Sequence, residues 1–227
     1  MKIIFFLILI FTCTNIISAR EIGETEITAE EGIEVYQDDK FYFLKKNVKI
    51  VSDNFTLLGD NIKIFFEKDL YDIQIIDAVG NVKLDSSKYD LKARGDTLLF
   101  KVKLEEIFIK GKNSILITKN TEMYSDDEIK VNNLNGDFYI KGPNSSLKSQ
   151  DTYIEGVNID GVFSTNSDNN DITLLNVFDE NIAYIQTENT DMYANIVKYS
   201  KEKSIIDLEN NVKIVRDGET ITGDYGT

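Results

Sequence analysis

Apolar and polar residues alternate in short segments along most of this chain. Residues 61–66, for example, read Asn-Ile-Lys-Ile-Phe-Phe, and residues 47–50 read Asn-Val-Lys-Ile. A period of two buries one face of a β-strand and leaves the other face in water. Turn residues separate these segments roughly every 8 to 12 residues, which is typical of an all-β protein. The pattern predicts about 16 strands in a sandwich, barrel or solenoid.

One small unit recurs along the chain. Residues 47–60 and 211–224 align without a gap and are identical at nine of fourteen positions, from a shared Asn-Val-Lys-Ile-Val to a shared Gly-Asp. A weaker copy begins at Asn81, and Gly95-Asp96 and Gly136-Asp137 repeat the final pair. A β unit of this size cannot bury its apolar face alone, so we expect the units to stack on one another.

Two tight turns are expected inside the repeated units. Residues 51–55 and 215–219 each join a β-rich run to a second one, and Asp217-Gly218 is a strong hairpin signal because glycine accepts a positive φ. The glycine of each Gly-Asp pair has two interpretations. It marks either a bend where a strand curls around the core or a plain turn.

The first residues have the layout of a signal peptide. Lys2 precedes an unbroken apolar run of nine residues, 3–11, and Ser18-Ala19 stands before Arg20. This run is shorter than the ~20 residues that a membrane-spanning helix needs. We therefore expect cleavage between Ala19 and Arg20, export, and a single β domain over residues 20–227. An uncleaved membrane anchor is the alternative interpretation.

Composition narrows the partners of the exported chain. Without residues 1–19 it has 24 basic and 39 acidic residues, a net charge of −15, which argues against nucleic acid as a partner. Cys13 lies in the predicted signal peptide, so the remaining chain has no cysteine for a disulfide. A domain of this length has to be stabilised by its apolar core.

Catalytic signals are weak. Residues 20–227 contain no histidine, cysteine or tryptophan, which removes Ser-His-Asp and Cys-His sites and the usual zinc ligands. The acidic runs 126–128 and 168–171 lack the spacing of a calcium loop, and no carboxylate pair stands out among the 39 acids. We expect no enzyme activity, no metal and no cofactor.

The apolar side of the alternating segments is the candidate binding surface. It is either a closed core or a trough that holds the acyl chains of a lipid, and the sequence does not separate the two. The predicted inward-facing set is Val48, Ile50, Ile62, Ile64, Leu98, Phe100, Val212 and Ile214.

The repeated residues resemble a known family. Ile27-Thr-Ala29, Asn47-Val48-Lys-Ile50 and Gly59-Asp60 look like the opening of an OstA-like domain, and residues 192–224 look like a second copy. The same pattern is shared by LptA, LptC and the N-terminal domain of LptD. It covers residues 27–227 and is sharp in the two terminal copies. In this family the pattern continues into another strand after residues 223–227, so a truncated C-terminus is one interpretation.

The resemblance implies an open, twisted antiparallel β-jellyroll (OstA-like) built from repeated hairpin units. It implies a periplasmic protein that carries lipopolysaccharide by the acyl chains of its lipid A. It also implies strand addition to LptC-like and LptD-like partners and to further copies of the chain. We expect the free edges near residues 27–35 and 211–222. The alternatives are a membrane-anchored LptC-like subunit, or a secreted β-solenoid or adhesin with a dry, closed core.

Overall fold

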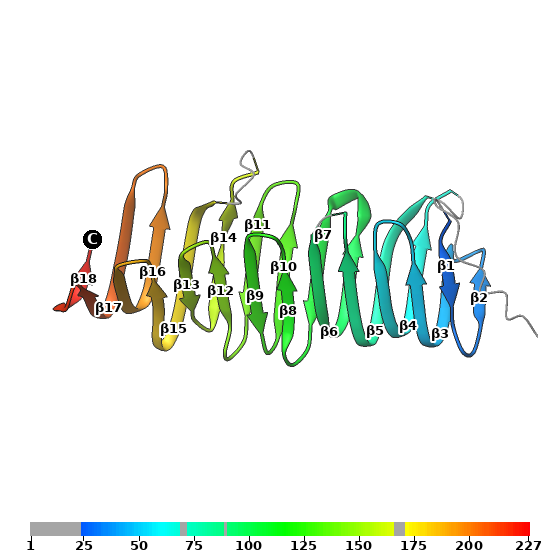
Figure 1. Ribbon diagram of the computed structural model, residues 1–227, viewed down its shortest axis with the longest axis horizontal. Helices are drawn as coiled ribbons and strands as arrows, with labels where there is room; N and C mark the ends of the chain where they lie inside the picture. The colour runs from blue at the N-terminus through cyan, green and yellow to red at the C-terminus, as the bar shows by residue number, and fades with distance from the viewer. Residues whose placement is uncertain (1–23, 69–71, 89, 166–170) are drawn as a thin grey trace, which may run out of the picture.

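The computed structural model describes residues 24–68, 72–88, 90–165 and 171–227. Within these residues it contains 18 strands in one continuous hydrogen-bonded network, and every described pairing is antiparallel. The strands stack side by side into a long body with the two ends of the chain at opposite ends (Figure 1). The prediction of an all-β antiparallel fold is confirmed.

Each rung of the stack is a V, and its two arms belong to two separate leaves. The first leaf contains β7 (Glu106–Lys110), β10 (Glu128–Asn132), β11 (Asp137–Lys141) and β14 (Asn158–Phe163). The second leaf contains β8 (Ser114–Ile117), β9 (Thr121–Ser125), β12 (Ser146–Ser149) and β13 (Thr152–Glu155). We call these eight strands the middle section, because each rung is broken where the leaves meet.

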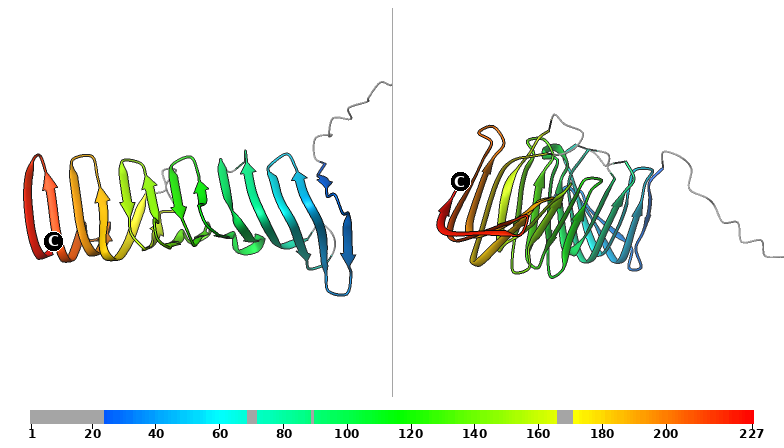
Figure 2. Two further views of the ribbon diagram at one scale, coloured as in Figure 1. Left: turned by 90° about the horizontal axis from the view of Figure 1, so that it is seen from below. Right: turned by 60° about the vertical axis from the view of Figure 1, so that its left-hand side comes forward.

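On either side of the middle section the strands are long and belong to both leaves. In the N-terminal section the strands are β1 (Glu26–Thr28), β2 (Ile33–Tyr36), β3 (Phe41–Val51), β4 (Thr56–Phe66), β5 (Ile73–Ser86) and β6 (Leu91–Lys101), with a short 3-10 turn at Val102–Leu104. In the C-terminal section they are β15 (Ile172–Gln186), β16 (Thr190–Ser200), β17 (Ile205–Arg216) and β18 (Glu219–Gly226). In Figure 2 the rungs of the N-terminal and C-terminal sections are aligned with the rungs of the middle section.

Three of the long strands, β3, β5 and β17, bend at positions where two successive residues have a positive φ. These pairs are Lys46-Asn47 (61° and 48°), Gly80-Asn81 (81° and 49°) and Asn210-Asn211 (64° and 55°). The register of the ladder shifts at each pair, as at a β-bulge. The bend turns the strand from one leaf into the other. The repeated Asn-Val of the sequence is therefore the corner of a rung.

The Gly-Asp pairs have a structural role at the same corners. Gly59-Asp60, Gly95-Asp96 and Gly223-Asp224 all lie inside strands, so the interpretation as plain turns is wrong for these three. Asn81 Nδ2 donates to both carboxylate oxygens of Asp60, at 3.2 and 3.1 Å. The aspartate of one rung thus holds the corner of the next.

Two of the four corners in the middle section, those between β7 and β8 and between β11 and β12, are made from a different motif. Gly111-Lys-Asn-Ser114 and Gly142-Pro-Asn-Ser145 have matching backbones, with φ of 127° and 128° at the glycines and 58° and 59° at the asparagines. The serine hydroxyl of each motif donates to the carbonyl of its own glycine at 2.7 Å. Both serines are buried. The corners of the middle section interrupt the ladder of hydrogen bonds, so each rung there is assigned as two strands. The described residues therefore contain 18 strands, where the sequence predicted about 16.

The apolar core lies between the leaves. It includes Ile62, Ile109, Ile129, Ile140, Leu147, Ile154 and Ile159, all fully buried, and runs through all three sections. Residues 142–165 include β12, β13 and β14.

Both ends of the stack have an unpaired strand edge. At one end β1 and β2 each pair only with β3, and at the other end β18 pairs only with β17. The prediction of an edge within residues 27–35 agrees with β1 and β2. The C-terminal edge was placed too early, because β17 with Ile214 is paired on both sides.

Candidate functional site

A cavity of ≈ 860 Å³ opens between the two leaves, under the rungs of β4 to β11 and β14. Its walls are apolar side chains from both leaves. The largest contributors are Phe55, Leu57, Ile73, Ile76, Leu84, Leu91, Leu98, Phe100, Ile107, Leu116, Met123, Val131 and Phe163. We call this space the central cavity.

The mouth of the central cavity faces away from the corners. Each V-shaped rung ends in a turn at the free edge of each leaf, and we call these two rows of turns the lips. Polar residues of the lips border the cavity, among them Asn54, Lys88 and residues 118–120 on the second leaf. Glu105, Asn133 and Thr165 border it on the first leaf. The site therefore has an apolar interior and a polar rim, the usual anatomy of a pocket for an amphiphile.

A second cavity of ≈ 780 Å³ lies at the C-terminal end of the stack. It is lined by Met192, Ile206, Leu208, Ile214 and Ile221, with charged residues of the β17–β18 turn at its border. Ile221 of β18 is 65% exposed although it pairs with the inward-facing Ile214, because no further rung covers it. The interior of the stack is thus open at this end.

All eight residues of the predicted inward set contribute to the apolar interior, either buried or packed against the core. Leu98 and Phe100 line the central cavity, and Ile214 lines the second cavity. The other five, Val48, Ile50, Ile62, Ile64 and Val212, line neither cavity. The predicted cleavage residues Ala19 and Arg20 lie outside the described residues.

Several wall residues of the central cavity were missed by the sequence pattern. The alternation grouped Ile73 with Ile75, but the structure turns Ile73 and Ile76 inward. A register shift between Phe65 and Phe66 reverses the facing of the residues beside it. Ile107, Leu116 and Met123 come from the middle section, where each arm of a rung is too short to show a clear alternation.

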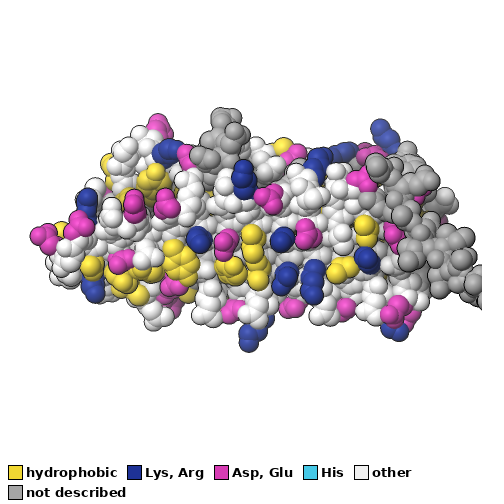
Figure 3. Space-filling view, in the orientation of Figure 1, with side chains coloured by type: hydrophobic (Ala, Val, Ile, Leu, Met, Phe, Trp, Pro, Cys, Tyr) yellow, Lys and Arg dark blue, Asp and Glu magenta, His cyan; other side chains and the backbone are white. Residues whose placement is uncertain are grey.

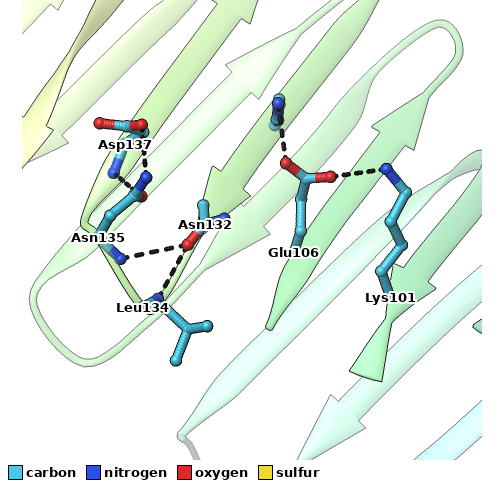
Figure 4. A network of polar contacts seen from close by, with 7 residues as sticks. Lys101, Glu106, Asn132, Leu134, Asn135 and Asp137 are labelled. Atoms are coloured by element: carbon cyan, nitrogen blue, oxygen red, sulfur yellow. Dashed lines mark hydrogen bonds and ion pairs between the residues drawn. The ribbon is translucent and has the colours of Figure 1, made fainter. Parts of the chain in front are cut away.

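Charged groups on the outer face of the first leaf form a compact network (Figure 4). Lys101 and Lys130 each place Nζ 2.8 Å from a carboxylate oxygen of Glu106, whose side chain is only 10% exposed. These two bonds, that from Lys101 first, lower the pKa of Glu106. Both ammonium groups also lie over the ring of Phe108. The network ties β6, β7 and β10 together and does not face a cavity.

Other sites for chemistry are not found in the described part of the chain. No group of three or more histidine, cysteine, aspartate or glutamate residues there is arranged to hold a metal ion. The described residues also contain no helix long and apolar enough to cross a membrane. On the face seen in Figure 3, acidic, basic and apolar side chains are interspersed.

Comparison with known proteins points to one family. A family profile described as "LptA/(LptD N-terminal domain) LPS transport protein" matches residues 26–137, which include β1 to β10 and most of the central cavity. Over these residues, just under half of the chain, the sequence matches this family. Its members act in lipopolysaccharide transport, a role that is not catalytic.

Solved structures include a similar chain, LptH from Pseudomonas aeruginosa. Its title describes it as the LptA-homologous periplasmic component of the lipopolysaccharide transport device. The sequences are 13% identical, the TM-score is 0.41, and the alignment covers 48% of this chain and 76% of LptH. No curated protein matches the sequence. The family assignment therefore depends on the profile match and on the fold described above.

Proposed function

We propose that this chain is a periplasmic bridge component that binds lipopolysaccharide and passes it from the inner to the outer membrane. The central cavity is the observation that supports this function. A closed, dry core would leave no space between the leaves, whereas this interior holds ≈ 860 Å³ behind an open mouth. Cavities of about 300–1,000 Å³ are the usual size for ligand sites.

The cavity walls suit acyl chains. Each methylene group moved from water into an apolar site contributes about 0.8 kcal/mol. Leu98 and Phe100 present such a surface from one strand, and Leu116 and Met123 present it from the opposite leaf. Binding of this kind needs neither a metal nor a buried cation. Together with the five inward residues outside the cavities, these side chains form the proposed path for lipid.

The two open ends suit stacking into a longer bridge. The unpaired edge of β18 and the edges of β1 and β2 can each add a strand from another β-jellyroll. Ile33 and Val35 on β2 and Ile221 on β18 have 48%, 55% and 65% of their surface exposed and pair with inward-facing residues. Adding a rung there would cover these side chains and continue the apolar interior. Further copies of the chain and LptC-like or LptD-like domains are the proposed partners.

Export by cleavage of residues 1–19 is part of the proposal and has a direct test. The mature protein isolated from the periplasm should begin at Arg20. A full-length product retained in the membrane would instead support an anchored, LptC-like role.

Photocrosslinking tests the lipid path. A photoreactive residue at Phe100, which lines the central cavity, should form adducts with lipopolysaccharide in cells that make it. The matched control is Leu99, the next residue of β6, which faces away from Phe100 and pairs with Asp77 and Phe108. Adducts at both positions, or at neither, would contradict a lipid path between the leaves.

Charged substitutions test the stacking of copies. Val35→Lys and Ile221→Lys each place an ammonium group on an exposed end of the interior. Both variants should fold and show a smaller oligomer population by light scattering. The control is Leu174→Lys, which changes a 47% exposed residue on a strand paired on both sides. An oligomer population that falls equally in all three variants would show that the edges are not responsible.

A further inference from the structure

Carboxylates occur along nearly the whole of both lips. On the second leaf, five of the six turns contain one: Asp53, Asp90, Asp151, Glu188 and Asp217. On the first leaf the turns that contain described carboxylates include those with Asp38, Glu67, Glu105, Asp171 and Glu202. Lysines accompany the acid in some of these turns, as Lys88, Lys103 and Lys201 do, so the shared feature of the turns is a carboxylate that would repel an anionic ligand placed beside it.

One rung is an exception on both of its lips. The turn before β9 is Thr118-Lys119-Asn120, and the turn after β10 is Asn133-Leu134-Asn135-Gly136. Neither contains a carboxylate. β9 and β10 are the two arms of the same rung, so the two turns lie on opposite lips of one V. We call this interruption of the acidic border the lip gap.

The lip gap lies over the central cavity. Thr118, Lys119 and Asn120 line that cavity from the second leaf, and Asn132, Asn133 and Gly136 line it from the first. Lys119 is exposed and has no ion pair among the described residues. Leu134 is 56% exposed in the opposite turn. A cation, several amide groups and an apolar side chain thus surround the mouth.

The other charged groups near the mouth do not cancel the positive charge of Lys119. The charged residues that line the central cavity are Lys88, Lys119 and Glu105, a net charge of +1. Asn133 Nδ2 donates to the carboxylate of Glu105 at 2.6 Å, and this bond holds the acid to the first leaf. Asp137 follows the lip gap, but it is exposed and accepts a bond from Asn135 at 2.7 Å (Figure 4).

We propose that the lip gap is the position where the anionic phosphate headgroup of a bound amphiphile sits, with Lys119 as its main contact. The inference rests on the proposed function, since the acyl chains would occupy the central cavity below. An ammonium group attracts a phosphate as a point charge, and amide N–H groups of the neighbouring asparagines can complete the contact. Elsewhere along the lips the same headgroup would lie beside a carboxylate. The gap therefore fixes where along the stack the ligand is held.

A matched pair of probes tests this assignment. Lysophosphatidic acid with one oleoyl chain and mono-oleoylglycerol share the acyl chain and the glycerol and differ in the phosphate. Both are measured below their aggregation limits by displacement of an uncharged fluorescent alkyl probe. Wild-type protein should bind the phosphorylated probe more tightly. Lys119→Glu should weaken that binding by about fivefold, an effect of the size expected for an exposed charge pair, and Lys119→Gln by less.

The controls separate a local effect from a general one. Neither Lys119 variant should change the binding of mono-oleoylglycerol. Lys83→Glu makes the same charge change at an exposed residue of β5 that does not line the cavity, and it should leave both probes unaffected. Added sodium chloride should reduce the difference between the two probes. Inorganic phosphate alone should not displace the fluorescent probe.

The outcomes distinguish this inference from the proposed function. If mono-oleoylglycerol binds and Lys119→Glu leaves the phosphorylated probe unchanged, the assignment of the lip gap is wrong and the acyl-chain cavity stands. Displacement by inorganic phosphate would also overturn it, because the anion would then bind without the lipid. If neither lipid displaces the fluorescent probe from wild-type protein, the proposed function and this inference both fail.

Discussion

The terminal sections and the middle section build the same V-shaped rung from different corners. In the terminal sections a long strand passes through the corner, and the paired residues there include Lys46, Asn47, Asn210 and Asn211 with positive φ. In the middle section the ladder stops at the corner, and at two of the four corners a Gly-x-Asn-Ser turn links the two arms of the rung. The overall shape is the same because the core between the leaves is continuous. The packing of the leaves therefore selects the V, and the corner sequence only has to permit it.

The two kinds of corner differ in what they require of glycine. A φ near 60° is accessible to asparagine and, at some cost, to other residues, and lysine occupies this position at one terminal corner. A φ of 127°, as at Gly111, is rarely accessible to any residue with a Cβ atom. Two glycine substitutions test this contrast directly, and two further comparisons set polar contacts of the middle section against polar contacts of the C-terminal section.

The largest effect is expected at the middle corner. Gly111→Ala forces a side chain into a φ of 127° and places its Cβ 2.4 Å from Asp96 Oδ2. We expect the free energy of unfolding to fall by about 2–3 kcal/mol, measured by urea denaturation. The added variant Asp96→Gly removes the clash, including the Asp96 Cβ that lies 2.7 Å away, but not the backbone strain. Full recovery of stability in the double variant would contradict a backbone origin.

A smaller loss of stability is expected at the terminal corner, and a second substitution should relieve it. Gly80→Ala places a Cβ 2.2 Å from Asp60 Oδ2, but Lys46 and Asn210 have similar backbone angles at the equivalent positions. The expected loss is about 1–2 kcal/mol and should come mostly from the side-chain clash. In the double variant with Asp60→Gly, which also removes the Asp60 Cβ that lies 2.7 Å away, the two losses should not add. Additive losses would show that the corner does not tolerate alanine.

The hydroxyl and amide contacts of the corners come next. Ser145→Ala leaves the buried carbonyl of Gly142 without its 2.7 Å bond and should cost about 1–2 kcal/mol. Asn195→Ala removes bonds to the carbonyls of Asp179, Glu180 and Asn181 at a terminal corner that water can reach. Its cost should be about 0.5–1 kcal/mol. Equal losses would mean that burial does not decide the strength of these contacts.

The smallest effect concerns pH. Lys101 and Lys130 hold the pKa of Glu106 below its usual value of 4.5, so the ionised carboxylate stabilises the fold above that pH and this contribution is lost as pH falls below it. Between about pH 5 and pH 3 the wild type should lose more stability than Glu106→Gln. The exposed pair Lys198–Glu209 in the C-terminal section is the comparison, and Glu209→Gln should change the free energy of unfolding at neutral pH little.

The sequence predicted the parts of this fold that depend on alternation and on sharp repeats. Both predicted hairpins are present, with Val51 opposite Thr56 and Arg216 opposite Glu219. All eight residues of the inward set contribute to the interior. These signals are local, because the facing of a side chain follows from its neighbours along one strand.

The location of the cavity could not be predicted in the same way. Whether Leu98 borders a space and Ile62 does not depends on how far apart the leaves stand at each rung, which is a property of the whole stack. Ile73 and Ile76 were not predicted to face the cavity, because one bulge shifts the pattern between them and a bulge has no fixed sequence signature. The Gly-x-Asn-Ser corners were visible in the sequence as turns, but only the structure shows that they are equivalent.

The separation of the ladders between the two leaves has a mechanical consequence. In the middle section the interstrand hydrogen bonds run along the stack within each leaf, and the arms of a rung are joined only at the corner. The lips can therefore move apart by small torsional changes at successive corners without breaking a ladder bond. The ladders resist a change in the length of the stack, whereas the corners allow the two leaves to separate. Under the proposed function, this opening would admit the ligand from the side while the stack keeps its length.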